Sequence, residues 1–295
     1  MKTTQPHTWF ITGSSRGFGR SLAVAALEAG DRVVATARRP EQLADLVGKY
    51  GDRALPVPLD VTDAAAVQAA FQAGVDRFGR IDVVVNNAGY ANSSAVETTP
   101  EDDFRKQFET NFWGVYRVST AAVPLLRAQG GGVIVQFSSI GGRVGGSPGL
   151  GSYQAAKFAV DGFTRVLAAE TAPFGIRCLV VEPGGFATDW AGSSMRIPEV
   201  TPEYEATVGE MVRRRAGVTS PGDPDRAGGI LVRLVKETEL PSHLVIGAGA
   251  VEMAQDYSRG QLDEAAAWEA VSRSADSGEE YPVAFPPAAG GTAAR

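Results

Sequence analysis

The sequence is poor in cysteine, in long apolar runs and in positive charge. Its one cysteine, Cys178, excludes a disulfide within the chain and a cluster of thiolate metal ligands. No stretch approaches the ~20 apolar residues of a membrane-spanning helix, and the first residues contain too short an apolar run for a signal peptide. We therefore expect a cytoplasmic protein with no membrane span and no metal site.

The shortage of positive charge also limits the possible partners. The 28 Lys and Arg residues are outnumbered by 34 Asp and Glu residues, so the formal net charge is −6. Nucleic-acid binding needs a clustered excess of Lys and Arg that neutralises phosphates, so we expect no nucleic-acid partner. Hydrophobic residues make up 44% of the chain, which is typical of a globular protein with a large core.

Short β-branched runs alternate along the chain with longer alanine-rich stretches of helical periodicity. This pattern is typical of an α/β protein built from strand, helix and strand units. We predict a Rossmann-like, doubly wound, seven-stranded parallel sheet with helices on both faces, whose ligands bind at the carboxyl ends of the strands. The expected strands cover 8–12, 32–36, 54–59, 82–86, 132–137, 176–182 and 243–247. The expected helices cover 18–29, 41–48, 63–78, 101–128, 152–173 and 223–237.

The alternating pattern weakens after residue 250. We therefore predict one domain over residues 1–250 and a C-terminal extension over 251–295. The extension is expected to begin with an amphipathic helix over 251–273. A loosely ordered tail rich in Gly, Pro and Ala would follow it.

The turn TGSSRGFG, residues 12–19, follows the first expected strand and leads into a helix. Glycine lets the backbone turn tightly and approach a pyrophosphate, and the N–H groups of the helix N-terminus favour its negative charge. A tight turn without a ligand is the alternative. No Lys-Ser or Lys-Thr pair follows the last glycine, which argues against a P-loop for ATP or GTP.

The end of the second expected strand indicates which dinucleotide would bind. An acidic residue there accepts the ribose 2′-hydroxyl of NAD, whereas an arginine suits the 2′-phosphate of NADP. Here Ala37 is followed by Arg38 and Arg39, and Arg16 lies inside the glycine turn. The sequence therefore favours NADP(H), with Arg16 and Arg38 on the phosphate.

Seven motifs, in the same order, resemble those of the classical short-chain dehydrogenases/reductases. They are the glycine turn at 12–19, LDV with Asp60, NNAG at 86–89, TNFWG with Asn111, FSSIGG with Ser139, YQAAK at 153–157 and PGGFAT at 183–188. The resemblance covers residues 8 to 250. It implies a dinucleotide-binding and catalytic domain that interconverts a carbonyl compound and an alcohol, usually as a homodimer or homotetramer.

The resemblance also implies a role for individual positions. It assigns Gly13, Ser15, Arg16, Phe18 and Gly19 to the pyrophosphate and adenosine, Asp60 and Val61 to the adenine, and Asn87, Ala88 and Gly89 to the cofactor ribose. It assigns Pro183, Gly184, Phe186 and Thr188 to the nicotinamide, beside Tyr153 and Lys157.

Tyr153 and Lys157 indicate acid–base chemistry independently of the resemblance. They are four residues apart on an expected helix, so both side chains emerge on one face. A free tyrosine titrates near pH ~10, and an adjacent ammonium, helped by an oxidised nicotinamide, would lower that pKa. Tyr153 would then donate a proton to a carbonyl oxygen in reduction and accept it in oxidation.

Ser139 and Asn111 complete the expected catalytic set. Ser139 ends an expected strand, where its hydroxyl could hydrogen-bond the substrate carbonyl. It precedes Tyr153 by fourteen positions, one more than the family's usual spacing, and we expect the glycine-rich loop to absorb the extra residue. Asn111 lies in a long helical stretch, where asparagine disfavours regular helix. The resemblance implies that a kink at Asn111 exposes a carbonyl that binds a water beside Lys157.

Two alternative functions compete with this interpretation. The stretch GGSPG, residues 145–149, fits the nucleophile elbow of serine hydrolases with Ser147 as nucleophile, but such an enzyme needs a histidine, and His243 is the only later one. A non-enzymatic dinucleotide-sensing regulator is the second alternative. It would be expected to lose part of the catalytic set, which this chain retains.

The segment after Thr188, with Tyr90 and the 140–151 loop, is expected to bind the substrate. Trp190, Met195, Ile197 and Met211 would form an apolar pocket for a small hydrophobic carbonyl compound or alcohol. The alternative is that they are core residues of a lid helix. The phrases VVATARRPEQL and VVEPGGFATDW look most like the retinol and 17β-hydroxysteroid dehydrogenase-like branch of the family. Arg213 to Arg215 are interpreted as a solvated helix face, and contact with an anionic substrate such as a carrier-bound acyl group is the alternative.

Overall fold

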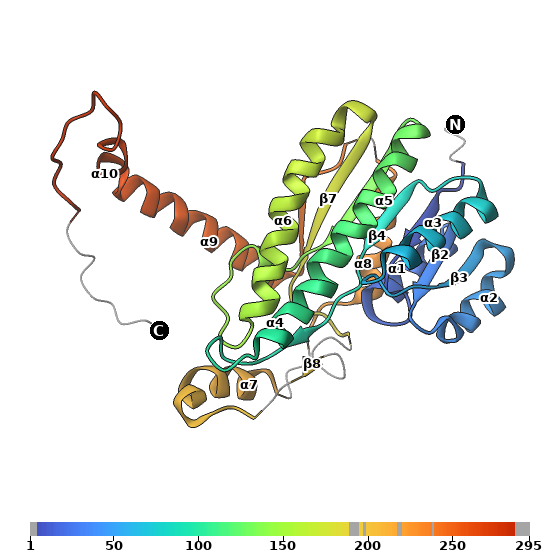
Figure 1. Cartoon of the computed structure of the whole chain (residues 1–295), viewed down its shortest axis with the longest axis horizontal. Coiled ribbons are helices and arrows are strands. Elements are labelled where there is room, and N and C mark those ends of the chain that lie inside the picture. The colour runs from blue at the N-terminus through green and yellow to red at the C-terminus, as the bar shows by residue number, and fades with distance from the viewer. Residues whose placement is uncertain (1–4, 189–194, 197–198, 217–219, 238, 287–295) are drawn as a thin grey trace.

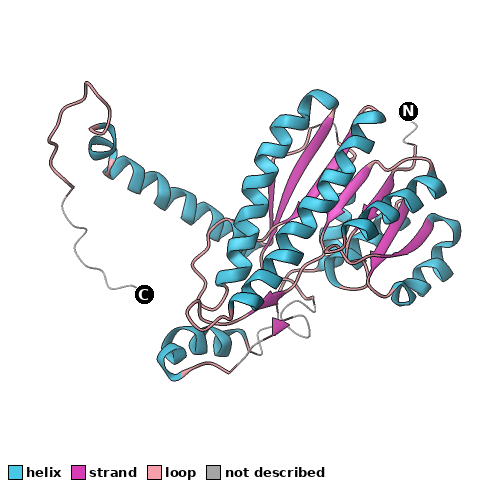
Figure 2. Ribbon diagram, viewed as in Figure 1, coloured by secondary structure: helices cyan, strands magenta, loops and turns pink. Residues whose placement is uncertain are grey.

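The computed structural model describes residues 5–188, 195–196, 199–216, 220–237 and 239–286. A seven-stranded parallel sheet runs through the centre of the molecule, and helices cover both of its faces (Figures 1 and 2). The strand order is β3-β2-β1-β4-β6-β7-β9, which reverses direction between β1 and β4. All seven expected strands and the doubly wound class are confirmed. The strands are β1 Thr8–Ile11, β2 Arg32–Ala37, β3 Ala54–Pro58, β4 Val83–Asn86, β6 Gly132–Phe137, β7 Ile176–Pro183 and β9 His243–Ile246.

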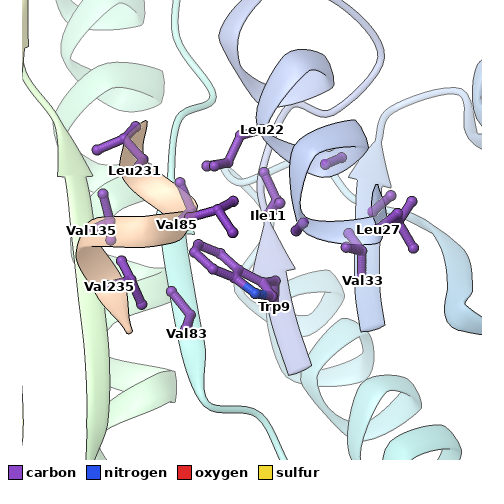
Figure 3. Packing of buried hydrophobic residues seen from close by; sticks show 14 of the residues in the cluster. Trp9, Ile11, Leu22, Leu27, Val33, Val83, Val85, Val135, Leu231 and Val235 are labelled. Carbon is purple, nitrogen blue, oxygen red and sulfur yellow. The ribbon is translucent and has the colours of Figure 1, made fainter. Parts of the chain in front are cut away.

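The helices on each face pack against one of two hydrophobic clusters. One cluster joins α1, α2 and α8 to the sheet, and the other joins α3, α5 and α6 to the opposite face. Figure 3 shows Trp9 of β1 among the labelled residues of the first cluster, beside Val83 and Val235. These helices are α1 Gly17–Glu28, α2 Ala44–Tyr50, α3 Ala64–Phe78, α5 Gly114–Ala128, α6 Gly151–Thr171 and α8 Pro224–Val235.

Local signals explain where several helices begin. Asp63 accepts hydrogen bonds from the N–H groups of Ala65 and Ala66 and so caps α3. Asp223 caps α8 in the same way, and Pro224 occupies the first helical position. Both boundaries were expected from the sequence.

The expected helix over 101–128 is interrupted. It consists of α4 (Glu101–Phe108), a π-helical turn over Glu109–Trp113 and α5. Asn111 lies in this turn and is fully buried. The expected irregularity at Asn111 is therefore present, because a π-helical turn inserts one residue into the hydrogen-bond pattern.

Two short strands outside the main sheet were not expected. β5 (Ala91–Asn92) pairs in parallel with β8 (Met195–Arg196). This pairing joins the segment after β7 to the end of β4. It carries the chain toward a π-helical turn over Glu205–Gly209 and the short helix α7, Glu210–Arg215.

The C-terminal extension is helical. It forms α9 (Ala248–Ala267) and α10 (Glu269–Arg273), and α9 projects away from the rest of the molecule (Figure 1). Only Ala250 and Ala254 of α9 are buried, so the expected amphipathic helix exposes most of its surface. None of the helices among the described residues is long and apolar enough to cross a membrane.

Candidate active site

The glycine turn between β1 and α1 packs against the end of β4. Gly13 and Gly17 have φ of +68° and +55°, in the left-handed region that glycine tolerates best. A Cβ added at Gly19 would lie 2.4 Å from both Nδ2 of Asn87 and the carbonyl oxygen of Gly13. The Arg16 side chain, at the N-cap position of α1, makes no capping hydrogen bond, and the N-terminus of a helix favours an anion. These features fit a pyrophosphate.

Thr12 and Asn87 fasten the turn to β4. The Thr12 hydroxyl accepts hydrogen bonds from the N–H groups of Asn87 at 2.9 Å and Ala88 at 3.0 Å. The Asn87 amide donates to the carbonyl oxygens of Thr12 and Gly13. Asn87, Ala88 and Gly89 therefore lie directly beside the glycine turn at the point where the strand order reverses, which is the ligand position of a doubly wound sheet.

The end of β2 presents arginine and no carboxylate. Ala37 ends β2 and is buried, and the next residue, Arg38, is exposed. Burial and Asp103 raise the pKa of Tyr90, whereas the charge of Arg38 acts to lower it, so Arg38 lies near the end of β4. Arg16 precedes α1 in extended conformation and is exposed at the same edge of the sheet.

The expected adenine contacts lie after β3. The exposed carboxylate of Asp60 accepts hydrogen bonds from the N–H and the hydroxyl of Thr62, at 3.0 and 2.8 Å. Val61 is buried, and its side chain packs against Gly114.

The expected nicotinamide contacts lie after β7. The ring of Phe186 packs on Phe18 with 4.8 Å between centroids, and Phe18 packs on Phe137 at 5.4 Å. Thr188 lies beside Gly17, since a Cβ added at Gly17 would be 3.6 Å from the Thr188 side chain. Pro183 is buried, and Gly184 follows with Ala250 of α9 against it. The end of β7 thus meets the start of α1, where Ser15 is half-buried.

Ser139 and Tyr153 are joined by a side-chain hydrogen bond. Ser139 follows β6 in extended conformation, and its hydroxyl also accepts a hydrogen bond from the N–H of Gly141 at 3.0 Å. Tyr153 lies in the first turn of α6 and is 6% exposed. The neighbouring Ser138 turns away and donates to the carbonyl oxygen of Lys157.

Lys157 lies one helical turn beyond Tyr153, and its Nζ is 5.8 Å from the centre of the phenol ring. Nζ donates to the carbonyl oxygen of Phe137 at 2.6 Å. The Asn111 side chain holds the end of β4 by bonding the N–H and carbonyl oxygen of Tyr90. Gly89 lies between the Asn111 side chain and the Lys157 ammonium. A Cβ added at Gly89 would be 2.5 Å from the Asn111 side-chain oxygen and 3.8 Å from Nζ of Lys157.

Burial dominates the titration of this pair. It raises the pKa of Tyr153 to about 12, although the Ser139 hydrogen bond and the charge of Arg215 act to lower it. Burial lowers the pKa of Lys157 to about 8. In the protein without a dinucleotide the pKa of Tyr153 is raised overall, since the loss of solvent outweighs the Ser139 hydrogen bond and the Arg215 charge. Tyr153 is held as a phenol and Lys157 is mostly an ammonium at neutral pH.

Comparison with known proteins decides the family. The sequence model described as short chain dehydrogenase matches residues 7–196. The chain belongs to the short-chain dehydrogenase family. Oxidoreductase BOA17 of Botryotinia fuckeliana is 54% identical over 250 residues, which cover 83% of this chain and 90% of the relative.

Two further comparisons support the membership of the chain in the short-chain dehydrogenase family. A crystal structure of a short-chain dehydrogenase from Streptomyces avermitilis matches with a TM-score of 0.86 and 39% identity, covering 92% of this chain and all of that one. The 3-ketodihydrosphingosine reductase of Bacteroides thetaiotaomicron is 39% identical over 201 residues, covering 68% of this chain and 71% of the relative. The protein is therefore an oxidoreductase of the carbonyl reductase and alcohol dehydrogenase type.

The serine hydrolase alternative has no support in the geometry of this short-chain dehydrogenase. The two ring nitrogens of His243 contact Ser242 and Asp161, at 3.0 and 2.6 Å. Ser147 lies in the loop before α6, and its N–H donates to Gln154. A nucleophile elbow would instead join a strand directly to a helix and bring the serine to the histidine.

Two residues near the site were missed or misinterpreted from the sequence. Gln107 of α4 is fully buried and bonds the N–H of Asn92 at 2.9 Å as well as the carbonyl oxygen of Tyr90. The interpretation of Arg213 to Arg215 as a solvated face is wrong for Arg215, which is half-buried and acts on Tyr153. Of the expected apolar pocket, Met211 is half-buried in α7, and Trp190 and Ile197 lie outside the described residues.

Proposed function

We propose that this protein interconverts a carbonyl compound and its alcohol with NADP(H), and that Tyr153 is the general acid and base. The observation that carries the proposal is the hydrogen bond between Tyr153 and Ser139, with the Lys157 ammonium 5.8 Å from the centre of the Tyr153 ring. These groups lie at the carboxyl edge of a sheet whose glycine turn fits a pyrophosphate. When bound there, the nicotinamide supplies hydride to the carbonyl carbon or accepts it from the alcohol carbon.

The pKa values indicate which group donates the proton. Because its pKa is about 12, Tyr153 carries a proton at neutral pH and can donate it to the carbonyl oxygen as negative charge develops there. Ser139 would donate a second hydrogen bond to that oxygen. Lys157 would stabilise the tyrosinate that remains, since a nearby ammonium favours the charged phenol. In the reverse direction the tyrosinate would accept the proton of the alcohol.

NADP(H) is the preferred cofactor in this proposal. The family uses nicotinamide dinucleotides of both kinds. Arg38, exposed directly after β2, and Arg16, at the start of α1, supply positive charge where the adenosine ribose would lie. The terminal residue of β2 is Ala37, so no carboxylate competes for the 2′-hydroxyl at that position.

A lipophilic carbon skeleton is the proposed substrate type. The resemblance to the retinol and 17β-hydroxysteroid dehydrogenase-like branch supports it. The similarity to a reductase whose name specifies 3-ketodihydrosphingosine is consistent with it. Val208, which is buried beside Gly149 just before α6, and the half-buried Met211 are described apolar residues of the segment after β7.

A homodimer or homotetramer is the proposed assembly. Trp113, at the end of the π-helical turn, is 45% exposed, and Tyr116, in the first turn of α5, is 41% exposed. Their ring centroids are 5.6 Å apart. Phe158 of α6 is 42% exposed. Exposed aromatic side chains of this size commonly mark a protein interface. Light scattering would test the assembly, and replacing Tyr116 by Lys should shift it toward the monomer.

A panel of ketones, aldehydes and oxo acids, with NADPH or NADH followed by absorbance, tests the proposed reaction. Substrate-dependent oxidation of NADPH that is faster than that of NADH is the expected result. The non-enzymatic regulator is the alternative outcome, in which the dinucleotide binds but no substrate of the panel is reduced. Preferential use of NADH would contradict the cofactor assignment alone.

A further inference from the structure

The segment that precedes α7 is anchored to the loop before the catalytic helix α6 and to the segment after β5. The Tyr204 hydroxyl hydrogen-bonds the carboxylate of Glu97, and the buried Val208 packs against Gly149. Gly149 lies four residues before Tyr153. Figure 1 shows α7 at the end of the molecule where α4 and α6 begin. The position of α7 relative to the catalytic helix is therefore set by several contacts that do not involve its arginines.

The three consecutive arginines of α7 have different surroundings. Arg213 forms an ion pair with Glu205, and Arg214 forms an ion pair with Glu210. Both side chains are exposed. Arg215 is half-buried, and within the described part of the chain no carboxylate forms an ion pair with it. The helix thus neutralises its two outward charges and keeps the third one available.

Arg215 lies on the less exposed side of its segment. Val208 is buried and Met211 and Arg215 are half-buried, whereas Arg213 and Arg214 are exposed. The side that packs on Gly149 through Val208 therefore also carries Arg215. Its guanidinium interacts electrostatically with the catalytic tyrosine, since it acts to lower the pKa of Tyr153. Burial lowers the pKa of Arg215 because its charge has lost part of its solvation. A half-buried cation of this kind is stabilised by an anion.

We propose that Arg215 binds a carboxylate of the substrate, so that the substrate is an oxo acid or hydroxy acid with an apolar body. This inference rests on the proposed function, because it places the substrate carbonyl at Tyr153. The planar guanidinium can bind a carboxylate through two parallel hydrogen bonds. Since Arg215 acts electrostatically on the tyrosine, the carboxylate would lie in the same site as the carbonyl. The site would then orient the substrate at both ends.

Matched acids and esters test the proposal. Phenylglyoxylate and 4-oxopentanoate, each with its methyl ester, are titrated by calorimetry into the protein saturated with the oxidised dinucleotide that binds more tightly. This complex binds the carbonyl compound without reducing it. The same four compounds are assayed for turnover with the reduced dinucleotide. Both measurements are made on the wild type and on Arg215→Met, Arg215→Lys and Arg214→Met.

The wild type is expected to bind at least one acid about tenfold to a hundredfold more tightly than its ester, as for a charged hydrogen-bonded pair. Arg215→Met should abolish this preference, Arg215→Lys should retain part of it, and Arg214→Met should leave it intact. Equal binding of acid and ester by the wild type overturns the proposal whether or not the variants fold. An acid preference that persists in Arg215→Met also overturns it.

The two measurements separate this inference from the proposed function. Reduction of esters and acids at equal rates would support the reductase and refute the role of Arg215. Acid binding that depends on Arg215, with no oxidation of the reduced dinucleotide, would support the anion site and refute the reductase. Neither binding nor turnover of any of the four compounds would count against both.

Discussion

Ser139 and Tyr153 are hydrogen-bonded across a loop of thirteen intervening residues. The loop begins with a short 3-10 turn over Ile140–Gly142. Gly145, Gly146 and Gly149 then have positive φ, so the chain reverses sharply before α6. These glycines lie in the part of the chain that was expected to absorb the additional residue between Ser139 and Tyr153.

Replacing Tyr153 by Phe should lower turnover by at least about a hundredfold, because general acid catalysis contributes roughly that much or more. The phenyl ring keeps the buried packing and loses only the hydroxyl that Ser139 contacts. The dissociation constant for NADPH, measured by fluorescence titration, should be nearly unchanged. Turnover at the wild-type rate would refute the role of Tyr153. Tyr281→Phe, at an 80% exposed position of the C-terminal extension, is the matched control.

The sheet was predictable because each strand has its own local signal. Runs such as VVV in β4 or VIV in β6 are buried on both faces, and only a parallel sheet covered by helices buries such runs completely. The glycine turn was also predictable from the sequence, since Gly13 and Gly17 adopt the positive φ that glycine tolerates best. Asp63 and Asp223 cap their helices with side-chain oxygens, and aspartate is a favoured residue type at that position.

Features that depend on contacts between distant segments were not predictable. β5 and β8 are two residues each and exist because the chain after β7 returns to the end of β4. Nothing in the run of three arginines distinguishes Arg215 from its neighbours. Its partial burial in the folded chain does. The pKa of Tyr153 also depends on how deeply α6 is buried, which no spacing between residues reveals.

Lys157 should make the stability of the protein rise with pH above neutrality. Its pKa falls from 10.5 to about 8 on folding, so between these values the unfolded chain binds the additional proton. The free energy of unfolding of the wild type relative to Lys157→Met should therefore rise by up to about 3 kcal/mol from about pH 7 to about pH 10. Urea titrations of both proteins across this range measure it. A pH-independent difference would contradict the burial of the ammonium.

Arg38→Ala should weaken NADPH binding by about tenfold to a hundredfold and leave NADH binding nearly unchanged, since it removes a charged hydrogen bond to the 2′-phosphate. Fluorescence titrations with both dinucleotides measure the two constants. Arg127→Ala removes the same charge at the opposite edge of the sheet, in the last turn of α5 before β6, and should have little effect on either constant. An equal loss of NADPH and NADH affinity in Arg38→Ala would contradict the assignment.

Gly19→Ala should destabilise the protein and weaken dinucleotide binding together. The new Cβ would meet Nδ2 of Asn87 and the carbonyl oxygen of Gly13 at 2.4 Å, so the side chain that fastens the turn to β4 or the turn itself must shift. Overpacking of this kind costs about 1–3 kcal/mol.

Gly162→Ala in α6 is the control for Gly19→Ala, because no atom lies within 4 Å of its added Cβ. That substitution should stabilise the helix by about 0.5–1 kcal/mol. Thermal unfolding with and without NADPH measures both effects, and unchanged NADPH affinity in Gly19→Ala would show that the turn does not carry the pyrophosphate.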